Sequence, residues 1–334
     1  MEKKKKKILV IRLGAIGDVV HTTIIPKSIK LKHPEYEIHY LSEKHIVPLL
    51  KNNPYIDNVI ELDPSRKRDN RYLLEIGIRL FKEHYDLVFN LTNAIRNHLL
   101  SIMAFPKRII QRVHTKGSWV EDFFYTAKKG VNDITIADEL TLGINEEAEE
   151  KVSQLLKNYP RPYTMIVPGG GTNQNRQGRI WNIDKWKELS DSILSIYGGT
   201  IVVCGSKSER IVHEKLNGNN IFIVSGELAL VETSALLSKA NLVISGDTGP
   251  VHIASAHSVN TISILGSTSP DKIKPYGPKG YYVSAKDGCK FCWKKKCKYL
   301  KEGQIYTPCM EKVTPQMVLD IIRDYNLLLG DDAN

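Results

Sequence analysis

The sequence predicts an α/β protein built from two Rossmann-like domains, each with a parallel sheet, that face each other across a cleft. Apolar runs typical of buried strands alternate with helical patterns from Lys7 onward, and this alternation restarts after Pro160. A short segment with two prolines, residues 158–163, separates the two series. A chain of 334 residues is long enough for two domains with full cores.

The first series begins with an apolar strand from Lys7, a turn that contains Gly14, Gly17 and Asp18, and a helix over residues 19–32. The turn reads G-x-x-G and lacks the G-x-G-x-x-G pattern of dinucleotide-binding proteins, so a nicotinamide enzyme is only weakly supported. Further strands are expected at residues 37–41, 59–62, 87–91 and 108–111, with helices at 72–83 and 97–104.

The second series has the same alternation. Strands are expected at residues 165–167, 200–204, 221–224, 242–244 and 261–265, with helices at 184–197, 209–216, 231–239 and after Gly249. A charged helical stretch at 146–157 precedes the segment with two prolines and is therefore expected in the first domain. We place the first domain at residues 1–158 and the second at 159–314. The terminal amphipathic helix, in residues 315–334, is expected to pack back on the first domain.

Composition and charge indicate a globular protein with an anionic partner. The contents of 42% hydrophobic and 25% charged residues are ordinary for such a protein. No apolar run approaches the roughly 20 residues of a membrane span, and the opening MEKKKKK lacks the apolar core of a secretory signal, so we expect a cytoplasmic chain. The net charge of +10 favours nucleic acid or an anionic membrane surface as partner. Lysines concentrate in residues 3–7 and 290–301, although such runs are often plain solvated tails.

The stretch NLVISGDTGPVHIASA, residues 241–256, predicts a strand, a tight turn and a helix. The proline suits the first helical turn, where its missing N–H is no loss, and Gly249 lets a ligand approach the backbone. Such a helix N-terminus attracts an anion. An ordinary strand-to-helix turn has the same pattern, but Asp247, Thr248 and His252 add polar groups that such a turn does not require. A packed histidine is the alternative for His252.

Four of the five cysteines form one group, whereas Cys204 lies in an apolar strand. In a reducing compartment, clustered thiols favour a metal over disulfides, and zinc and iron are both open. The spacing C-x2-C-x4-C-x11-C is not that of a standard zinc finger, and free thiols are an equal alternative. The cysteine group consists of Cys289, Cys292, Cys297 and Cys309.

Three motifs in this order resemble a known family. The runs RLGAIGDVVHT, RIWNIDKW and DTGPVH are similar to those of glycosyltransferase family 9, the lipopolysaccharide heptosyltransferases, and the resemblance extends from Ile8 to about Leu328. It implies a fold of the glycosyltransferase B type, a nucleotide-diphosphate sugar donor, and inversion at the transferred carbon. It also implies that the domain at residues 1–158 binds the acceptor and that the domain at 159–314 binds the donor. No cofactor is expected for catalysis, and no D-x-D motif stands in the cleft segments to hold a divalent metal. Some relatives that modify autotransporter proteins hold iron on four cysteines, so a structural metal is open for the cysteine group.

The resemblance also assigns donor-binding residues. A glycine-rich loop with Thr172 and Asn173 resembles the loop that faces the donor phosphates, although a plain flexible loop fits equally. Arg179 stands where the family commonly has a lysine that contacts the diphosphate, and it keeps the charge. Glu209 matches an acid near the donor ribose, with helix-terminal charge as the alternative. Contacts to the transferred sugar are expected from Asp247, and contacts to the phosphates from Thr248, Gly249 and His252.

Inverting transfer needs a base beside the acceptor hydroxyl, opposite the leaving diphosphate. Asp18 lies at a strand-end turn of the first domain and is the carboxylate that we expect in this role. A helix N-cap is the alternative, because Asp is a preferred capping residue. Gly17 and His21 are assigned to the same site, where His21 would orient Asp18 or contact an acceptor phosphate.

The leading interpretation is transfer of a heptose from ADP-heptose to the inner core of lipopolysaccharide, by a protein peripheral to the cytoplasmic face of the inner membrane that does not bind nucleic acid. A protein hydroxyl is the nearest alternative acceptor. A nucleotide-sugar epimerase on the same fold is another enzyme alternative. The non-enzyme alternative is a basic nucleic-acid-binding protein, which charge alone favours.

Overall fold

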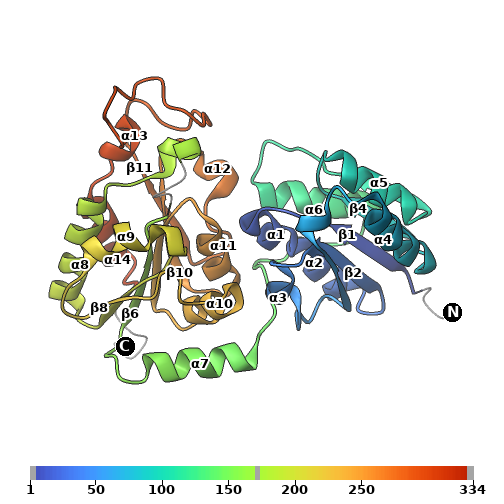
Figure 1. The fold of residues 1–334 in the computed structure, drawn as a ribbon, viewed down its shortest axis with the longest axis horizontal. Coiled ribbons are helices and arrows are strands. Elements are labelled where there is room, and N and C mark those ends of the chain that lie inside the picture. Colours follow the sequence, from blue (N-terminus) through green and yellow to red (C-terminus); the bar gives the residue numbers. More distant parts are fainter. Residues whose placement is uncertain (1–4, 170–173, 329–334) are drawn as a thin grey trace. The chain divides into compact units, whose positions relative to one another are not determined.

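The computed structural model describes residues 5–169 and 174–328, and the chain divides into two compact units, Met1–Asn145 and Glu146–Asn334 (Figure 1). The division precedes helix α7 (Glu146–Leu156), which packs on α10 (Leu230–Ser238) of the second unit. Lys151 Nζ on α7 donates to Glu232 Oε1 on α10 at 2.6 Å. The charged helix before residue 158 therefore belongs with the second unit, and not with the first as we expected.

The first unit contains a five-stranded parallel sheet in the order β3-β2-β1-β4-β5. The chain passes from β1 to β2 and β3 on one side and then to β4 and β5 on the other, so the direction of winding reverses between β1 and β4. In such sheets ligands bind at the carboxyl ends of the strands beside this reversal. The strands lie at the predicted places: β1 (Lys7–Ile11), β2 (Glu37–Glu43), β3 (Asn58–Leu62), β4 (Leu87–Asn90) and β5 (Arg108–Gln111).

The helix predicted over residues 19–32 is two helices, α1 (Ile16–Thr22) and α2 (Ile24–Lys32). The hydroxyls of Thr22 and Thr23 each donate at 2.7 Å to a carbonyl three residues back, and Pro26 has no N–H to continue the helical bonding. The other helices of this unit are α3 (Val47–Leu50), η1 (Pro64–Arg66), α4 (Asn70–Lys82), α5 (Ile95–Met103) and α6 (Trp119–Gly130). The sequence prediction omitted α6, although Ser118 and Glu121 form a capping box at its start.

The second unit contains a six-stranded parallel sheet in the order β11-β10-β9-β6-β7-β8, so its winding reverses between β6 and β9. Its strands are β6 (Tyr163–Val167), β7 (Thr200–Val203), β8 (Ile221–Ile223), β9 (Leu242–Gly246), β10 (Asn260–Leu265) and β11 (Gly280–Ser284), of which β11 was not predicted. Its further helices are η2 (Gln174–Arg179), α8 (Ile183–Tyr197), η3 (Lys207–Glu209), α9 (Arg210–His213), η4 (Glu214–Leu216), α11 (Gly249–Ala256), α12 (Pro270–Ile273), α13 (Pro308–Glu311) and α14 (Pro315–Asp324). The two Rossmann-like sheets of the predicted fold are therefore confirmed.

The amphipathic pattern of α14 is explained inside the second unit. Val318 and Ile322 are fully buried in one core with Trp186 of α8, and α14 also contacts β11. The apolar face of α14 thus contributes to the core of the second unit, and packing of residues 315–334 on the first domain stays a prediction. None of the described helices combines the length and the apolar character needed to cross a membrane.

Candidate active site

In the second unit, the polar turn DTGP lies beside the reversal of the sheet. Strand β9 ends at Gly246, and Thr248 is the N-cap of α11. The Thr248 hydroxyl lies 3.0 Å from Ser245 Oγ, and no described side chain caps the first N–H groups of α11. These N–H groups and the positive end of the helix dipole form an anion-binding position.

Gly169 brings the loop after β6 against this turn. Its φ of 60° is rare for residues with a side chain, and a Cβ there would lie 2.6 Å from Thr248 Cγ2. At the end of β9, a Cβ on Gly246 would lie 3.3 Å from the carbonyl oxygens of both Arg179 and Pro168. The absence of these side chains lets the backbone of two loops meet at the N-terminus of α11.

Arg179 and Asp247 form an ion pair at the same place. Arg179 Nε lies 2.8 Å from Asp247 Oδ2, and the Asp247 side chain is 6% exposed. Arg179 Nη1 also donates to the Asp247 carbonyl at 3.4 Å. His252 is buried one turn inside α11. The structure thus brings Arg179, Asp247, Thr248, Gly249 and His252 together, whereas Thr172 and Asn173 lie outside the described residues.

Glu209 has the capping role that we gave as its alternative. Its Oε2 accepts from the Ser206 N–H at 2.8 Å and from the Ser206 hydroxyl at 2.7 Å, which closes a capping box. The residue follows β7, the strand next to β6, which is where Rossmann folds place the acid that binds a ribose. Both roles are therefore compatible with its position.

In the first unit, Asp18 lies in the first turn of α1, at the carboxyl end of β1. The N-cap of α1 is Ala15, with φ of 59°, so capping does not account for Asp18. The Asp18 carboxylate forms an ion pair with Arg12, whose Nη1 donates to the Leu91 carbonyl at 3.0 Å after β4. Arg12 therefore holds the Asp18 carboxylate beside the carboxyl ends of β1 and β4, where the winding of the sheet reverses.

His21 is a buried, neutral imidazole. Burial, together with the charges of Arg112 and Arg12, lowers its pKa to about 3. Its ring meets the ring of Trp119 edge-on at 6.3 Å. A neutral histidine does not supply the positive charge that favours an acceptor phosphate, so the cations of this site are Arg12 and Arg112.

The sequence reasoning did not identify Arg12 and Arg112. Arg112 Nη2 lies 3.2 Å from Asp122 Oδ2, and its guanidinium stacks over Phe123 at 4.5 Å. Its Nε is buried without a hydrogen-bond partner in the described structure. Each of the two arginines directly follows a strand, Arg12 after β1 and Arg112 after β5. This position could have identified them from the sequence, because ligands bind at the carboxyl edge of a parallel sheet.

The cysteine group does not form a metal site among the described residues, where no three His, Cys, Asp or Glu side chains are arranged to hold an ion. Cys309 is buried and its Sγ lies 3.2 Å from Thr307 Oγ1, whereas Cys292 is exposed. Burial raises the pKa of Cys309, the hydrogen bond with Thr307 opposes this shift, and the charges of Cys289, Cys292 and Cys297 when ionised add to it. Cys204 is separate, and burial raises its pKa to about 12.

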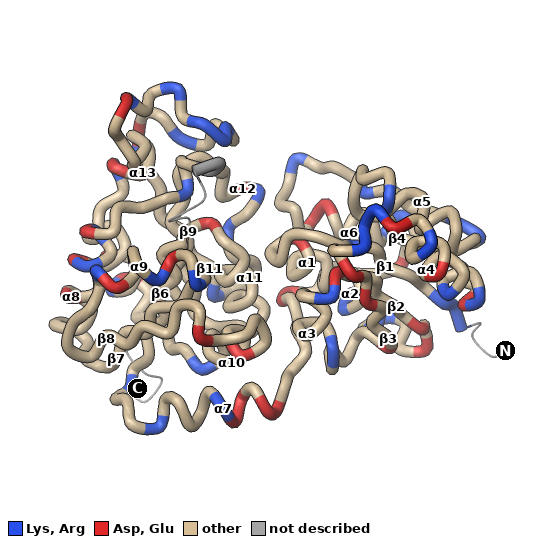
Figure 2. Tube along the Cα trace, viewed as in Figure 1, with Lys and Arg blue, Asp and Glu red and all other residues tan. Residues whose placement is uncertain are grey.

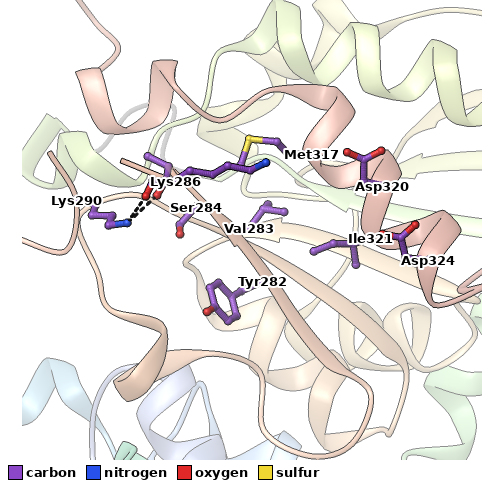
Figure 3. A pocket seen from close by; sticks show the side chains of 10 residues that line it. Tyr282, Val283, Ser284, Lys286, Lys290, Met317, Asp320, Ile321 and Asp324 are labelled. Atoms are coloured by element: carbon purple, nitrogen blue, oxygen red, sulfur yellow. Dashed lines mark hydrogen bonds between the residues drawn. The ribbon is translucent and has the colours of Figure 1, made fainter. Parts of the chain in front are cut away.

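A pocket of about 460 Å³ lies elsewhere, between β11 and α14 (Figure 3). Its lining includes Asp320, Asp324 and Lys290 but none of the predicted site residues. Lys290 Nζ donates to the carbonyls of Lys286 at 2.7 Å and Ala285 at 3.2 Å, so its charge already has acceptors. The polar groups of the proposed chemistry therefore lie outside this pocket.

Comparison with known proteins gives a consistent family. A profile of glycosyltransferase family 9 (heptosyltransferase) matches residues 73–302. The chain is 23% identical over 301 residues to the lipopolysaccharide core heptosyltransferase OpsX of Haemophilus influenzae, covering 84% of each chain. The crystal structure of a family 9 glycosyl transferase from Veillonella parvula matches with a TM-score of 0.84 and 19% identity, covering 98% of this chain and 99% of that one. The ADP-heptose lipopolysaccharide heptosyltransferase II of E. coli matches with a TM-score of 0.76 and 20% identity, covering 98% and 100%.

Proposed function

The chain belongs to glycosyltransferase family 9, the heptosyltransferases, and from this premise we propose that it transfers a heptose with inversion from ADP-heptose to the inner core of lipopolysaccharide. The observation that carries the proposal is the Arg179–Asp247 pair beside the uncapped N-terminus of α11, at the reversal of the second sheet. A relative that acts on the lipopolysaccharide core and a structural neighbour named for ADP-heptose support the donor and the acceptor. As an enzyme of this family, the chain is neither an epimerase nor a non-enzymatic nucleic-acid-binding protein.

The donor is proposed to bind the second unit. The N–H groups at the start of α11, with Thr248, Gly249 and the glycine-rich loop of Thr172 and Asn173, bind the diphosphate. Arg179 neutralises the charge that grows on the leaving diphosphate, and Asp247 accepts hydroxyls of the sugar. Glu209 accepts hydroxyls of the ribose, and His252 contacts the phosphates from the first turns of α11.

Asp18 is proposed as the general base. Its carboxylate takes the proton from the acceptor hydroxyl, the acceptor oxygen bonds to the anomeric carbon of the heptose, and the bond from that carbon to the ADP oxygen breaks on the opposite face. The electron pair of that bond leaves with ADP. Arg12 holds the carboxylate in place, while Gly17 keeps the turn small beside it. No step requires a cofactor.

A donor and acceptor screen tests this function. The parent chain should be stabilised against heat by ADP-heptose more than by GDP- or UDP-sugars, because a ligand that binds only the folded state raises the unfolding midpoint. It should also move labelled heptose from ADP-heptose onto lipopolysaccharide that lacks inner-core heptose. Stabilisation by ADP-heptose without transfer to that acceptor, but with transfer to protein, would change the acceptor to a protein hydroxyl. Indifference to every nucleotide sugar would refute the donor.

We further propose that the enzyme is a peripheral protein of the cytoplasmic membrane face, where its lipid acceptor lies, and that it acts without nucleic acid. A structural iron or zinc on Cys289, Cys292, Cys297 and Cys309 also stays a prediction, based on the clustering of these cysteines in the sequence. Elemental analysis after anaerobic purification tests it. Less than about a tenth of an equivalent of iron plus zinc would refute a site that folding depends on.

A further inference from the structure

Helices α4 and α5 expose a large apolar surface on the first unit. Of the 17 large hydrophobic side chains that are exposed in the described chain, seven lie on these two helices or directly after α5. Within each helix they are spaced three or four residues apart, so they share one face. We call this set the α4–α5 face: Leu74, Ile78, Phe81, Ile95, Leu99, Ile102 and Phe105.

The two helices are neighbours, so their apolar rows form one surface. Gly77 of α4 faces Met103 of α5 closely enough that a Cβ at Gly77 would overlap the methionine. The rings of Phe81 and Phe105 lie 6.0 Å apart at the C-terminal ends of α4 and α5. Exposed apolar patches of this kind on a globular unit mark interaction surfaces.

Phe105 is both highly exposed and held in a strained backbone conformation. Its side chain is 77% exposed, and its backbone φ is 45°, a left-handed value that is rare for bulky residues. Asparagine, which tolerates this conformation, occupies three of the nine positive-φ positions among the described non-glycine residues. A large aromatic residue at a strained and exposed position suits contact with something outside the chain.

The basic side chains around the α4–α5 face favour an anionic partner. Exposed basic side chains border it along α4 and just after α5, whereas Glu75 is an exposed carboxylate on α4. Lys107 pairs with Asp86, which leaves the other basic side chains to face solvent. Figure 2 shows lysine and arginine positions along these helices in blue. An apolar face with a basic border is the pattern of proteins that lie on anionic lipid. The bordering residues are Arg71, Arg79, Lys82, Lys107 and Arg108.

The face also begins at the sheet edge that holds the proposed base. Helix α5 follows the carboxyl end of β4, and Arg96 in its first turn lies 3.4 Å from Glu43 at the end of β2. Asp18 follows β1, which lies between β2 and β4, at this same edge. A lipid surface against the α4–α5 face would therefore lie beside the acceptor side of the first unit.

We propose that the α4–α5 face is the membrane-docking surface of this protein, with its apolar side chains inserted among anionic lipids and its basic border on the headgroups. The inference rests on the proposed function only in that the acceptor is a membrane lipid. Docking itself requires neither donor nor acceptor, so it is measured with vesicles that contain neither.

Vesicle flotation of the full chain tests the proposal with Phe105→Asn. Vesicles of phosphatidylglycerol and phosphatidylethanolamine should bind the parent, and the variant should bind at least about tenfold more weakly, a ratio worth about 1.4 kcal/mol. Asparagine relieves the left-handed strain, so the unfolding midpoint of the variant should be unchanged or higher. Ile95→Asn, at 80% exposure, should weaken binding similarly, whereas the matched control Ile211→Asn, at 79% exposure on α9, should not.

The outcomes separate docking from catalysis. Loss of vesicle binding in Phe105→Asn and Ile95→Asn but not Ile211→Asn supports the face, whether or not heptose transfer is found. Equal binding by all four proteins would overturn the proposal. A parent dimer that Phe105→Asn converts to a monomer, with vesicle binding unchanged, would show that a second copy covers the face instead. Failure of the parent to use ADP-heptose would refute the proposed function and leave docking standing.

Discussion

The sharpest test of the proposed chemistry is Asp18→Asn. Asparagine keeps the size of the side chain but cannot accept the acceptor proton, so the rate of transfer should fall by about 10²–10⁴-fold, or about 3–5 kcal/mol of barrier. The donor contacts proposed for the second unit do not involve Asp18, so the dissociation constant for ADP-heptose should stay within about twofold, less than about 0.5 kcal/mol.

The structure adds a cost in stability that the sequence did not reveal. Asp18 pairs with Arg12, and their side chains are 20% and 12% exposed. Removing the carboxylate charge leaves Arg12 with the Leu91 carbonyl as its hydrogen-bond acceptor among the described residues, which should lower the free energy of unfolding by about 1.5–3 kcal/mol. Assays must therefore be run at a temperature where urea titration shows the variant to be folded.

Asp57→Asn is the matched control. Asp57 pairs with Lys30 at 2.8 Å and accepts from the Ile38 N–H at 2.7 Å, at the amino-terminal end of β2 and away from the proposed site. Its loss should also lower stability, but the transfer rate of the folded variant should equal that of the parent. Measurement of kcat, donor dissociation constant and urea midpoint for the three proteins decides the matter. If folded Asp18→Asn turns over within about threefold of the parent, less than about 1 kcal/mol of barrier, Asp18 is not the base.

Three further predictions concern the second unit and pH. Arg179→Ala should weaken ADP-heptose binding and lower the transfer rate, because it removes the cation beside the diphosphate and leaves Asp247 without this counter-charge. Arg179→Lys should retain most of the affinity and most of the rate. Calorimetry compares the donor affinities of the two variants, and kinetics compares their transfer rates. Gly169→Ala should destabilise the fold by about 1–3 kcal/mol and weaken donor binding, because the added Cβ would overlap the Thr248 side chain. The control is Gly303→Ala, which also has a positive φ but whose Cβ would have no described atom within 4 Å. This control should leave donor affinity unchanged. Burial lowers the pKa values of His21 to about 3 and of His257 to about 4, so below pH 6.5 the unfolded chain binds more protons than the folded chain. The free energy of unfolding should therefore fall by up to about 1.4 kcal/mol per pH unit for each histidine as the pH is lowered. Equal urea midpoints at pH 7 and pH 5 would contradict this.

The central strands were predictable because each is a short apolar run that is buried on both faces of a parallel sheet. Leu9 and Val10 of β1 and Val243 and Ile244 of β9 are all fully buried, and period-two alternation is not required there. The edge strand β11 was missed because Tyr281 and Tyr282 remain partly exposed, so its pattern is mixed. The break between α1 and α2 depends on hydroxyl-to-carbonyl bonds, which an apolar pattern does not register.

The residues of the candidate site that lie in sequence motifs were predictable, whereas those whose role depends on tertiary packing were not. DTGPVH identified the start of α11, and RIWNIDKW identified Arg179, but their pairing across β6 and β9 depends on strand order. Arg12 directly follows an apolar run and was therefore counted with the strand. The neutral state of His21 comes from its burial, to which Trp119 contributes, and from the charges of Arg112 and Arg12. These properties arise from residues far apart in the sequence, so no local pattern contains them.

The two units use the same backbone arrangement for opposite ligands. In each, a strand beside the reversal of its sheet ends in a turn, and a helix starts without a side-chain cap in the described structure. The first turn of α11 carries no ionised residue, so its N–H groups and dipole remain attractive to a diphosphate. The first turn of α1 carries Asp18, whose negative charge occupies the positive end of that helix and pairs with Arg12. Such a turn repels a second anion but accepts a hydroxyl proton, and this difference in charge is why we propose leaving-group binding in the second unit and base catalysis in the first.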